Sequence, residues 1–399
     1  MRTTLKNGRL TIYLEGRIDS NNAAQTETEL LDAYSGAAGA EMAMDAEGLE
    51  YISSAGLRVL MKLRKQYGKP LPVVNVSPEV YDIFEVTGFT DLLEVHKRLR
   101  EVSVEDRTLL GEGANGKVYR FTPDEMIKVF RPGITLEEIE KEREASRKAF
   151  LLGVPCAISF DTVRCGESYG TIYELLKAAT LTERIRADPA SLPHYAEESA
   201  KLLRQMHAIE IPEGQLPKAS RLLHRTIDAV AADFEPEETA LMHRLYDAVP
   251  EKMRFVHNDY HSKNVMESNG ELILIDLGDS GAGNPLIDLI HCYMVYNLIG
   301  GGLQKHAPDE ISFLGLTYGE LERFWNVFLP AYAGSEAAAE RLNRILAPYA
   351  QLMYLTASIA HPMLPTQYHA AYASQVREQV LSHAEEMMES MARTMPSAF

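Results

Sequence analysis

The stretch FVHNDYHSKNVMESNGELILIDLGDS, residues 255–280, contains Asp259, Asn264 and Asp276 among its acidic and amide residues. In the spacing H-x-D-x-x-x-x-N, Asp259 can accept a proton from a hydroxyl group or orient that hydroxyl, while Asn264 turns back toward a metal. Asp276 follows the apolar run ELILI and is the expected main ligand of magnesium, because a hard cation that bridges phosphates takes oxygen ligands. A turn of Asn, Asp and Ser between two strands would contain the same residue types without chemistry. The segments that precede this stretch decide between the two interpretations.

A glycine-rich segment, LLGEGANGKVYRF, lies at residues 109–121. Gly111, Gly113 and Gly116 stand in a G-x-G-x-x-G-x-V frame that Val118 closes. In a dinucleotide site such glycines follow a strand and open a helix, whereas here VYRF and MIKVF are typical of two strands joined by a turn at TPDE. A hairpin of this kind covers phosphates with backbone N–H groups, and Lys128 on its second strand can reach the α- and β-phosphates of ATP.

Lys128 needs an acid to hold it in place. The predicted helix LEEIEKEREASRKAF offers Glu142 and Glu144, and the spacing to the turn at residues 153–155 favours Glu142, although a solvated helix face would explain either acid. The apolar strand IYELL contains Glu174 and suits an adenine-binding hinge, where backbone groups contact the base. Five elements therefore follow one another in the order that phosphoryl transfer from Mg-ATP requires.

Composition and charge exclude several other classes of protein. The chain has 399 residues, is 46% hydrophobic and carries a formal net charge of −17, which argues against binding to nucleic acid or to an anionic membrane. We find no signal-peptide run and no 18-residue apolar stretch. The three cysteines show no C-x-x-C spacing, and we expect them to be small buried residues of a cytoplasmic protein.

Residues 106–399 resemble the aminoglycoside phosphotransferase and choline kinase branch of the protein-kinase-like fold. The segment HNDYHSKN is similar to that family's H-G-D-x-H-x-x-N, with Asn258 in place of the usual Gly and His261 at the second His. IDLGDSGAGNPLIDL is similar to its metal-binding strand followed by a helical Asp. The resemblance implies that Asp288 anchors the catalytic loop and that His257 supports the loop rather than reacting. It does not identify the acceptor, which in this family is an antibiotic, choline, a sugar, an amino acid or a protein.

The first hundred residues alternate between strand-like and helix-like patterns, which predicts a small α/β domain. Ser20 or Asn21 is expected to cap the first helix, and Gly68 and Gly88 are expected to end the second and third helices. The predicted strands and helices are residues 9–16 (strand), 20–34 (helix), a strand within 41–52, 53–68 (helix), 71–76 (strand) and 77–88 (helix).

Residues 8–97 resemble the STAS domain of bacterial anti-sigma factor antagonists. The segments LEGRID, SSAGL, VVNVSPEV and EVTGF occur in the order that this family shows. By the resemblance, Ser54 stands at the family's phosphorylated switch serine, while Ser53 replaces the Asp that often precedes it. Capping of the following helix by Ser53 or Ser54 explains the same residues, so both interpretations stay open.

The expected architecture has two parts. Residues 1–98 form an α/β STAS-like regulatory domain, and residues 99–106 form a charged linker. Residues 107–399 form an α+β bilobal protein-kinase-like domain, with an N-lobe at about 107–177 and a largely helical C-lobe at about 178–399.

Two hypotheses of different classes follow. The first is a phosphotransferase that uses ATP and Mg²⁺, acts on the hydroxyl of a small molecule or of a protein serine, and is fused to a signalling module whose partner is an anti-sigma factor or another STAS-binding protein. A more specific form has the kinase domain phosphorylate Ser54. The second is an adaptor in which the STAS domain binds the partner and the kinase-like domain senses nucleotide. The presence of Lys128, Asp259, Asn264 and Asp276 favours the enzyme.

Overall fold

The computed structural model describes residues 1–394 except 7, 38, 114, 176–177 and 300–305. The chain divides into two compact units, one of residues 1–103 with 162–167 and one of residues 104–161 with 168–399. Each unit is considered by itself. Within the described residues, no helix is both long enough and apolar enough to cross a membrane.

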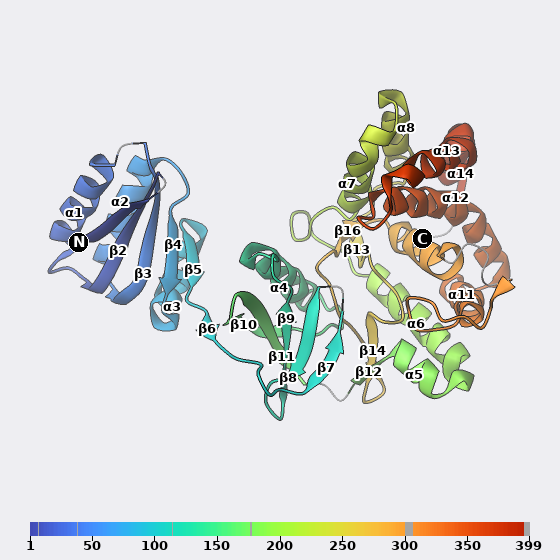
Figure 1. The fold of residues 1–399 in the computed structure, drawn as a ribbon, viewed down its shortest axis with the longest axis horizontal. Coiled ribbons are helices and arrows are strands. Elements are labelled where there is room, and N and C mark those ends of the chain that lie inside the picture. Colours follow the sequence, from blue (N-terminus) through green and yellow to red (C-terminus); the bar gives the residue numbers. More distant parts are fainter. Residues whose placement is uncertain (7, 38, 114, 176–177, 300–305, 395–399) are drawn as a thin grey trace. The chain divides into compact units, whose positions relative to one another are not determined.

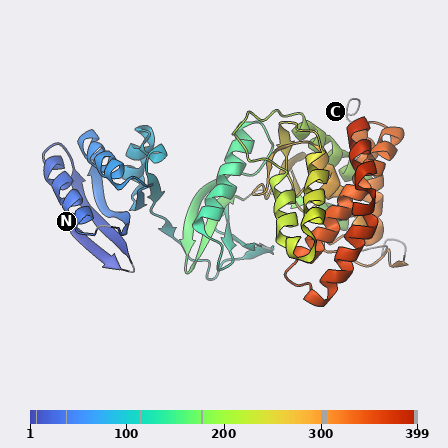
Figure 2. The ribbon, with the colours of Figure 1, turned by 90° about the horizontal axis from the view of Figure 1, so that it is seen from above.

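The first unit is built on a five-stranded sheet in the order β1-β2-β3-β4-β5, in which β1 runs antiparallel to β2 and the other neighbours are parallel. Helices α1 and α2 lie side by side against it (Figures 1 and 2). The elements are β1 (Arg2–Lys6), β2 (Arg9–Ile18), α1 (Ala23–Ser35), β3 (Glu41–Ile52), α2 (Ser54–Tyr67), β4 (Pro72–Val76), α3 (Pro78–Val86), a 3₁₀ turn at Phe89–Asp91 and β5 (Glu94–Lys97). This is the α/β domain that the sequence predicted.

Local sequence sets where these helices begin and end. The Ser53 side chain caps α2 by accepting from the backbone N–H of Ala55 at 3.2 Å, and Gly68 ends the helix in the left-handed conformation at φ +72°. The expected cap of the first helix at Ser20 or Asn21 was wrong, because Asn22 is the residue that precedes α1, which begins at Ala23. The Asn22 side chain that precedes α1 accepts instead from Asp19 N at 2.9 Å and so closes the preceding turn.

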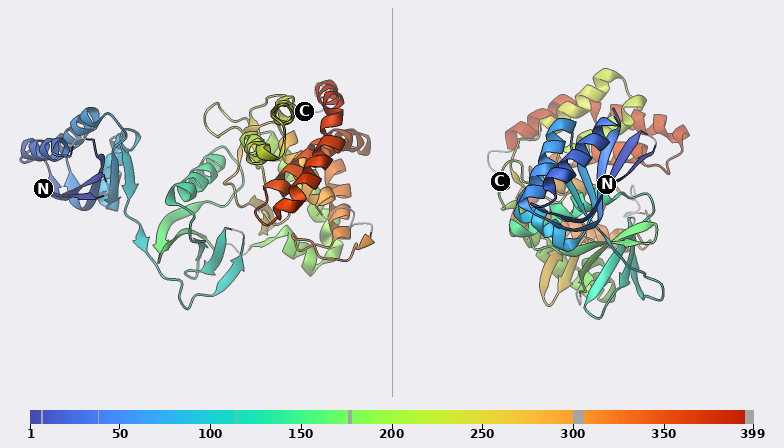
Figure 3. Two further views of the ribbon diagram at one scale, coloured as in Figure 1. Left: turned by 45° about the horizontal axis from the view of Figure 1, so that its top comes forward. Right: turned by 90° about the vertical axis from the view of Figure 1, so that its left-hand side faces the viewer.

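In the N-lobe of the second unit, four strands pair in the order β11-β9-β8-β7, with α4 beside them (Figures 1 and 3). Strands β8 and β9 form the expected antiparallel hairpin, and a reciprocal pair of bonds between Thr135 and Glu138 caps α4. The elements along residues 100–174 are β6 (Arg100–Glu101), β7 (Leu109–Glu112), β8 (Gly116–Arg120), β9 (Glu125–Phe130), α4 (Leu136–Leu151), β10 (Ser159–Cys165) and β11 (Ser168–Glu174), of which β6 and residues 162–165 of β10 belong to the first unit.

The C-lobe is mostly helical, as expected. Two small sheets, β12-β14-β15 and β13-β16, carry the segments that the sequence marked as catalytic. Figure 2 shows α7 and α8 beside the C-terminal helices, and α7 contacts α12 while α8 contacts α14. The elements are β12 (Ala178–Thr180), α5 (Leu181–Ala187), α6 (Leu192–His207), α7 (Arg221–Val230), α8 (Pro236–Asp247), β13 (Arg254–Val256), β14 (Val265–Ser268), β15 (Glu271–Leu274), β16 (Gly281–Gly283), α9 (Leu286–Tyr293), α11 (Tyr318–Ala333), α12 (Glu336–Ala360), α13 (His369–Gln379) and α14 (Ala384–Thr394). Short helical turns lie at Pro189–Ser191, Ala231–Asp233, Thr366–Tyr368 and Leu381–His383, and a π-helical turn at Met294–Leu298 continues α9.

Candidate active site

A half-buried lysine joins the two lobes. Lys128 Nζ on β9 lies 2.9 Å from Glu142 Oε1 on α4 and 3.5 Å from Asp276 Oδ1 in the C-lobe. Burial works against the charge of this ammonium group, but the attraction of Asp276 and Glu142 outweighs burial and raises the pKa of Lys128 above its usual value. The lysine is therefore a fixed positive charge at the point where the lobes meet.

Of the two acids left open by the sequence, Glu142 is the one that contacts Lys128. Glu144 instead contacts Arg147 at 2.8 Å and Lys148 at 3.5 Å on its own helix. Gly278 lets Glu142 approach the C-lobe closely, since a Cβ at this glycine would lie 3.2 Å from Glu142 Cγ.

The three glycines of the hairpin have different surroundings. A Cβ at Gly116 would collide with the carbonyl oxygen of Val129, so this glycine is needed for the close pairing of β8 and β9. A Cβ at Gly111 or Gly113 would meet no described heavy atom within 4 Å, which leaves open space along the loop. Val118 lies directly opposite Lys128 in the β8–β9 ladder.

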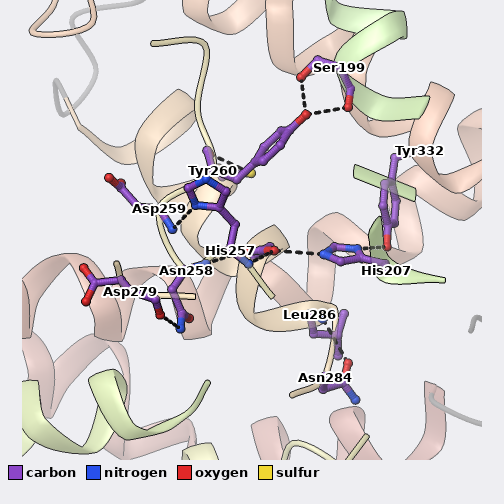
Figure 4. Close-up of polar contacts among 12 residues, drawn as sticks. Ser199, His207, His257, Asn258, Asp259, Tyr260, Asp279, Asn284, Leu286 and Tyr332 are labelled. Atoms are coloured by element: carbon purple, nitrogen blue, oxygen red, sulfur yellow. Dashed lines mark hydrogen bonds and ion pairs between the residues drawn. The ribbon is translucent and has the colours of Figure 1, made fainter. Parts of the chain in front are cut away.

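Asp288 on α9 holds the loop that carries Asp259, and Figure 4 labels His257, Asn258 and Asp259 of this loop. Its Oδ2 accepts from the backbone N–H of His257 at 2.8 Å, and its Oδ1 accepts from that of Asn258 at 2.7 Å. His257 in turn accepts from Asp259 N at 3.3 Å through its Nδ1. These hydrogen bonds fix the backbone of the loop immediately before Asp259.

The sequence analysis missed two residues that support Asp288. His207 on α6 contacts Asp288 Oδ2 through Nε2 at 3.0 Å and Tyr332 Oη through Nδ1 at 2.8 Å (Figure 4). Burial raises the pKa of Asp288, but the bond from His207 and the neighbouring His257 outweigh it, so the pKa lies below the usual value. The available signal was a histidine at the buried end of the apolar face of α6.

Asp259 and Asn264 are in direct contact. Asn264 Nδ2 donates to Asp259 Oδ2 and to the Asp259 carbonyl, each at 2.9 Å. The other carboxylate oxygen, Oδ1, lies 3.4 Å from His261 Nε2 and 3.5 Å from His291 Nε2. Burial lowers the pKa of His261 to about 4, although the charge of Asp259 acts in the opposite direction.

The donor set fits magnesium. Because the Asn264 amide nitrogen is used in bonds to Asp259, its oxygen is left as a ligand, and the Asp276 carboxylate is 40% exposed. Among the residues that the structure describes, no group of three or more His, Cys, Asp or Glu side chains could hold a metal. Magnesium bound to a nucleotide typically takes one or two protein oxygens and completes its shell with phosphates and water.

A cleft of about 1060 Å³ opens beside these groups. Asp259, Asp276 and Asp279 line it from the C-lobe, together with Arg221 and Arg225 of α7. The opposite wall is formed by α4. The cleft is therefore open to Asp259 and Asp276 on the same side.

Two of the predicted site residues, Glu174 and Ser54, do not lie with the other predicted site residues. The side chain of Glu174 is exposed at the end of β11, and the expected hinge continues into residues 176–177, outside the described residues. Ser54 belongs to the first unit, where it is the exposed first residue of α2. Because Ser53 provides the cap, the Ser54 hydroxyl has no hydrogen-bond partner in the described part of the chain.

Known proteins resemble each unit. The anti-sigma factor antagonist-like protein BtrV of Bordetella bronchiseptica is 33% identical over 106 residues, which cover 26% of this chain and 90% of BtrV. The anti-sigma-B factor antagonist of Listeria monocytogenes is 29% identical over 87 residues, covering 21% of this chain and 75% of that protein.

Solved kinase structures align with the larger part of the chain. A ternary complex of APH(2")-IIa with streptomycin and ATP covers 71% of this chain and 93% of its own, at 18% identity and a TM-score of 0.44. A choline/ethanolamine kinase family protein from Mesorhizobium loti covers 72% and 92%, at 15% identity and a TM-score of 0.44. Family models match both units: a STAS domain model matches residues 1–94, and a phosphotransferase model matches residues 106–308. The chain thus belongs to the phosphotransferase enzyme family and carries an N-terminal STAS domain.

Proposed function

We propose that the chain transfers the γ-phosphate of ATP to an acceptor hydroxyl with the help of Mg²⁺, and that its STAS domain links this activity to a signalling partner. One observation carries the proposal. Lys128 lies between Glu142 and Asp276, at 2.9 and 3.5 Å, and Asp276 lines the same cleft as Asp259. A fixed cation, a metal-binding carboxylate and an acceptor-facing carboxylate together are what phosphoryl transfer needs.

Each of these residues has a defined task. Lys128 neutralises charge on the α- and β-phosphates, and Gly111 and Gly113 allow the loop to approach them. Asp276 and Asn264 would hold Mg²⁺, which neutralises charge on the phosphates when bound. Asp259 aligns the acceptor hydroxyl for attack. The oxygen of the acceptor hydroxyl forms a bond to the γ-phosphorus, while the bond from the γ-phosphorus to the bridging oxygen breaks and ADP leaves. The proton of the acceptor hydroxyl passes to Asp259.

The acceptor is either a small molecule with a hydroxyl group or a protein serine. Ser54 is a specific candidate of the second kind, in cis or in trans, because its hydroxyl is exposed and is not used in capping α2. Phosphate at the first turn of a helix is stabilised by free N–H groups and the helix dipole. An anti-sigma factor or similar protein is the partner that the STAS domain suggests.

A transfer experiment tests the proposal. The chain is incubated with γ-labelled ATP and Mg²⁺, without acceptor and then with a panel of alcohols and aminoglycosides. We expect label on the protein or turnover of an acceptor. Asp259→Asn should abolish transfer while ATP binding persists, and Asp276→Ala should remove the magnesium-dependent part of ATP binding. Label on the peptide around Ser54 would identify the protein acceptor.

ATP binding without transfer to any acceptor would support the second candidate, an adaptor that senses nucleotide. The completeness of the Lys128, Asp259, Asn264 and Asp276 set argues for the enzyme. Binding of neither ATP nor Mg²⁺ would contradict both functions.

A further inference from the structure

The carboxylate of Asp259 is contacted from two directions. Its Oδ2 accepts from Asn264 Nδ2 at 2.9 Å, whereas its Oδ1 lies near the Nε2 atoms of His261 and His291, at 3.4 and 3.5 Å. Asn264 and His261 belong to the same loop as Asp259. His291 comes from α9 and is the contact that ties this carboxylate to another element of the C-lobe.

Helix α9 contacts the catalytic loop residue by residue. Asp288 accepts from the N–H groups of His257 and Asn258, and Cys292 Sγ lies 3.4 Å from the carbonyl of Tyr260. His291 stands three residues after Asp288, on the same face of the helix, and reaches the residue between these contacts, Asp259. The helix is almost wholly buried, so it can hold the loop against the C-lobe core.

The surroundings of the His291 ring define where its hydrogen lies. An imidazole nitrogen that faces an ionised carboxylate must carry a hydrogen, because two lone pairs would otherwise oppose each other. Nε2 is that nitrogen in His291. Nδ1 is buried without a hydrogen-bond partner among the described residues, so a hydrogen there would be an unpaired buried donor. The geometry therefore selects the form with hydrogen on Nε2 alone.

We propose that His291 is a positioning residue for phosphoryl transfer, which fixes the orientation of Asp259 through its Nε2–H. This inference rests on the proposed function and adds a residue to it. Asn264 bonds to Oδ2, and His291 Nε2 lies 3.5 Å from Oδ1, so these two contacts restrict rotation of the carboxylate, which lines the cleft. Asp259 then orients the acceptor hydroxyl and takes the proton of that hydroxyl late in the reaction.

The state of the ring can be measured without any activity. Long-range ¹H–¹⁵N spectra of the full-length ¹⁵N-labelled chain separate the two neutral forms of histidine from the doubly protonated one. The signals of His291 are those that disappear in His291→Phe. We expect one protonated nitrogen, Nε2, and an unprotonated Nδ1. A hydrogen on Nδ1, or the averaged signals of a freely exposed ring, would overturn the inference.

Kinetics then separates positioning from folding. With water as acceptor in Mg-ATP hydrolysis, His291→Phe should lower kcat roughly ten- to a hundredfold, because a displaced catalytic group costs about that much. KM and ATP affinity should stay within about twofold of wild type, since the lost interaction acts in the transition state. His291→Gln places an amide N–H near the position of Nε2 and should recover most of the rate. Equal rates for wild type and His291→Phe would refute the positioning role.

The two proposals fail in different ways. A wild-type chain that neither binds nor hydrolyses ATP would contradict the proposed function, and the form of the His291 ring would still decide whether it holds Asp259. Normal turnover in wild type with unaltered turnover in His291→Phe would contradict this inference alone. A similar loss in His291→Gln and His291→Phe, with reduced ATP affinity in both, would show a general structural role instead.

Discussion

Asn258 shows how the backbone conformation at the site selects the residue type. It has φ +69°, in the left-handed region where Gly is favoured and Asn is among the better tolerated of the other residues. Asn258 Nδ2 also donates to the carbonyls of Asp279 at 2.9 Å and Ala219 at 3.2 Å. The Asn that stands in place of the usual Gly therefore fits the turn and ties the catalytic loop to the segment after Asp276.

The ionisation of Asp288 predicts how the stability of the fold depends on pH. Its folded pKa lies below the ordinary value of 3.8, so its contribution to stability is complete above that value and is lost as the pH falls through the folded pKa. Asp288→Asn should cost about 3–5 kcal/mol of unfolding free energy near neutral pH, because it breaks a buried charged network. Urea unfolding between about pH 3 and 8 should show this gap constant above about pH 5 and narrower below about pH 4.

The exposed Asp279 provides the control, since Asp279→Asn should change stability little at any of these pH values. A stability gap between wild type and Asp288→Asn that already closes between about pH 7 and 6 would contradict the assignment of this pH dependence to the Asp288 carboxyl group.

At the scale of elements, Gly56 sets how closely α2 packs on the sheet. A Cβ at this position would lie 2.7 Å from side-chain atoms of both Ile18 and Ile52. Gly56→Ala should therefore lower the unfolding free energy of the first unit by about 1–3 kcal/mol through overpacking. Gly36→Ala is the matched control, because a Cβ there would lie 3.4 Å from its nearest neighbour, an ordinary contact. Equal unfolding midpoints for both variants in denaturant titrations would contradict this account.

Helices α7 and α8 each carry a histidine followed four residues later by an aspartate: His224 and Asp228 on α7, and His243 and Asp247 on α8. These side chains contact each other across the two helices. The two Nδ1 atoms lie 2.8 Å apart, and each Nε2 faces the Asp of the other helix, at 3.4 and 3.2 Å. A double-mutant cycle of His224→Phe and His243→Phe should give a coupling of about 1 kcal/mol near neutral pH. Strict additivity of the two changes would show that the rings do not stabilise each other.

The sequence predicted those features that rest on short-range spacing. Alternating patterns predicted the α/β fold of the first unit, and the motifs that resemble the aminoglycoside phosphotransferase family predicted the bilobal fold of the second. Both predictions were confirmed. The contacts of His207 with Tyr332 and Asp288 join residues 125 and 81 positions apart, and no local pattern encodes such a pairing. The choice between Glu142 and Glu144 likewise depends on how α4 is rotated about its axis, which tertiary packing decides.

At the scale of the whole molecule, each unit has a hydrophobic core of its own. One core contains buried residues between Leu10 and Leu93, and the other contains buried residues between Ala149 and Met391. Units with separate cores can unfold in separate transitions. A ligand that binds one unit then stabilises that unit directly. It changes the stability of the other unit only if the two units are thermodynamically coupled.

Scanning calorimetry with Mg-ATP measures this coupling. We expect two transitions, and saturating Mg-ATP should stabilise the transition of the second unit by about 2.7 kcal/mol at a hundred times Kd. The transition of the STAS unit, identified by its shift in Gly56→Ala, should not move. Asp276→Ala should remove the effect of Mg-ATP without removing either transition. If the STAS transition moves together with that of the kinase unit, the two domains are thermodynamically coupled, and nucleotide at Lys128 acts on the helix that carries Ser54.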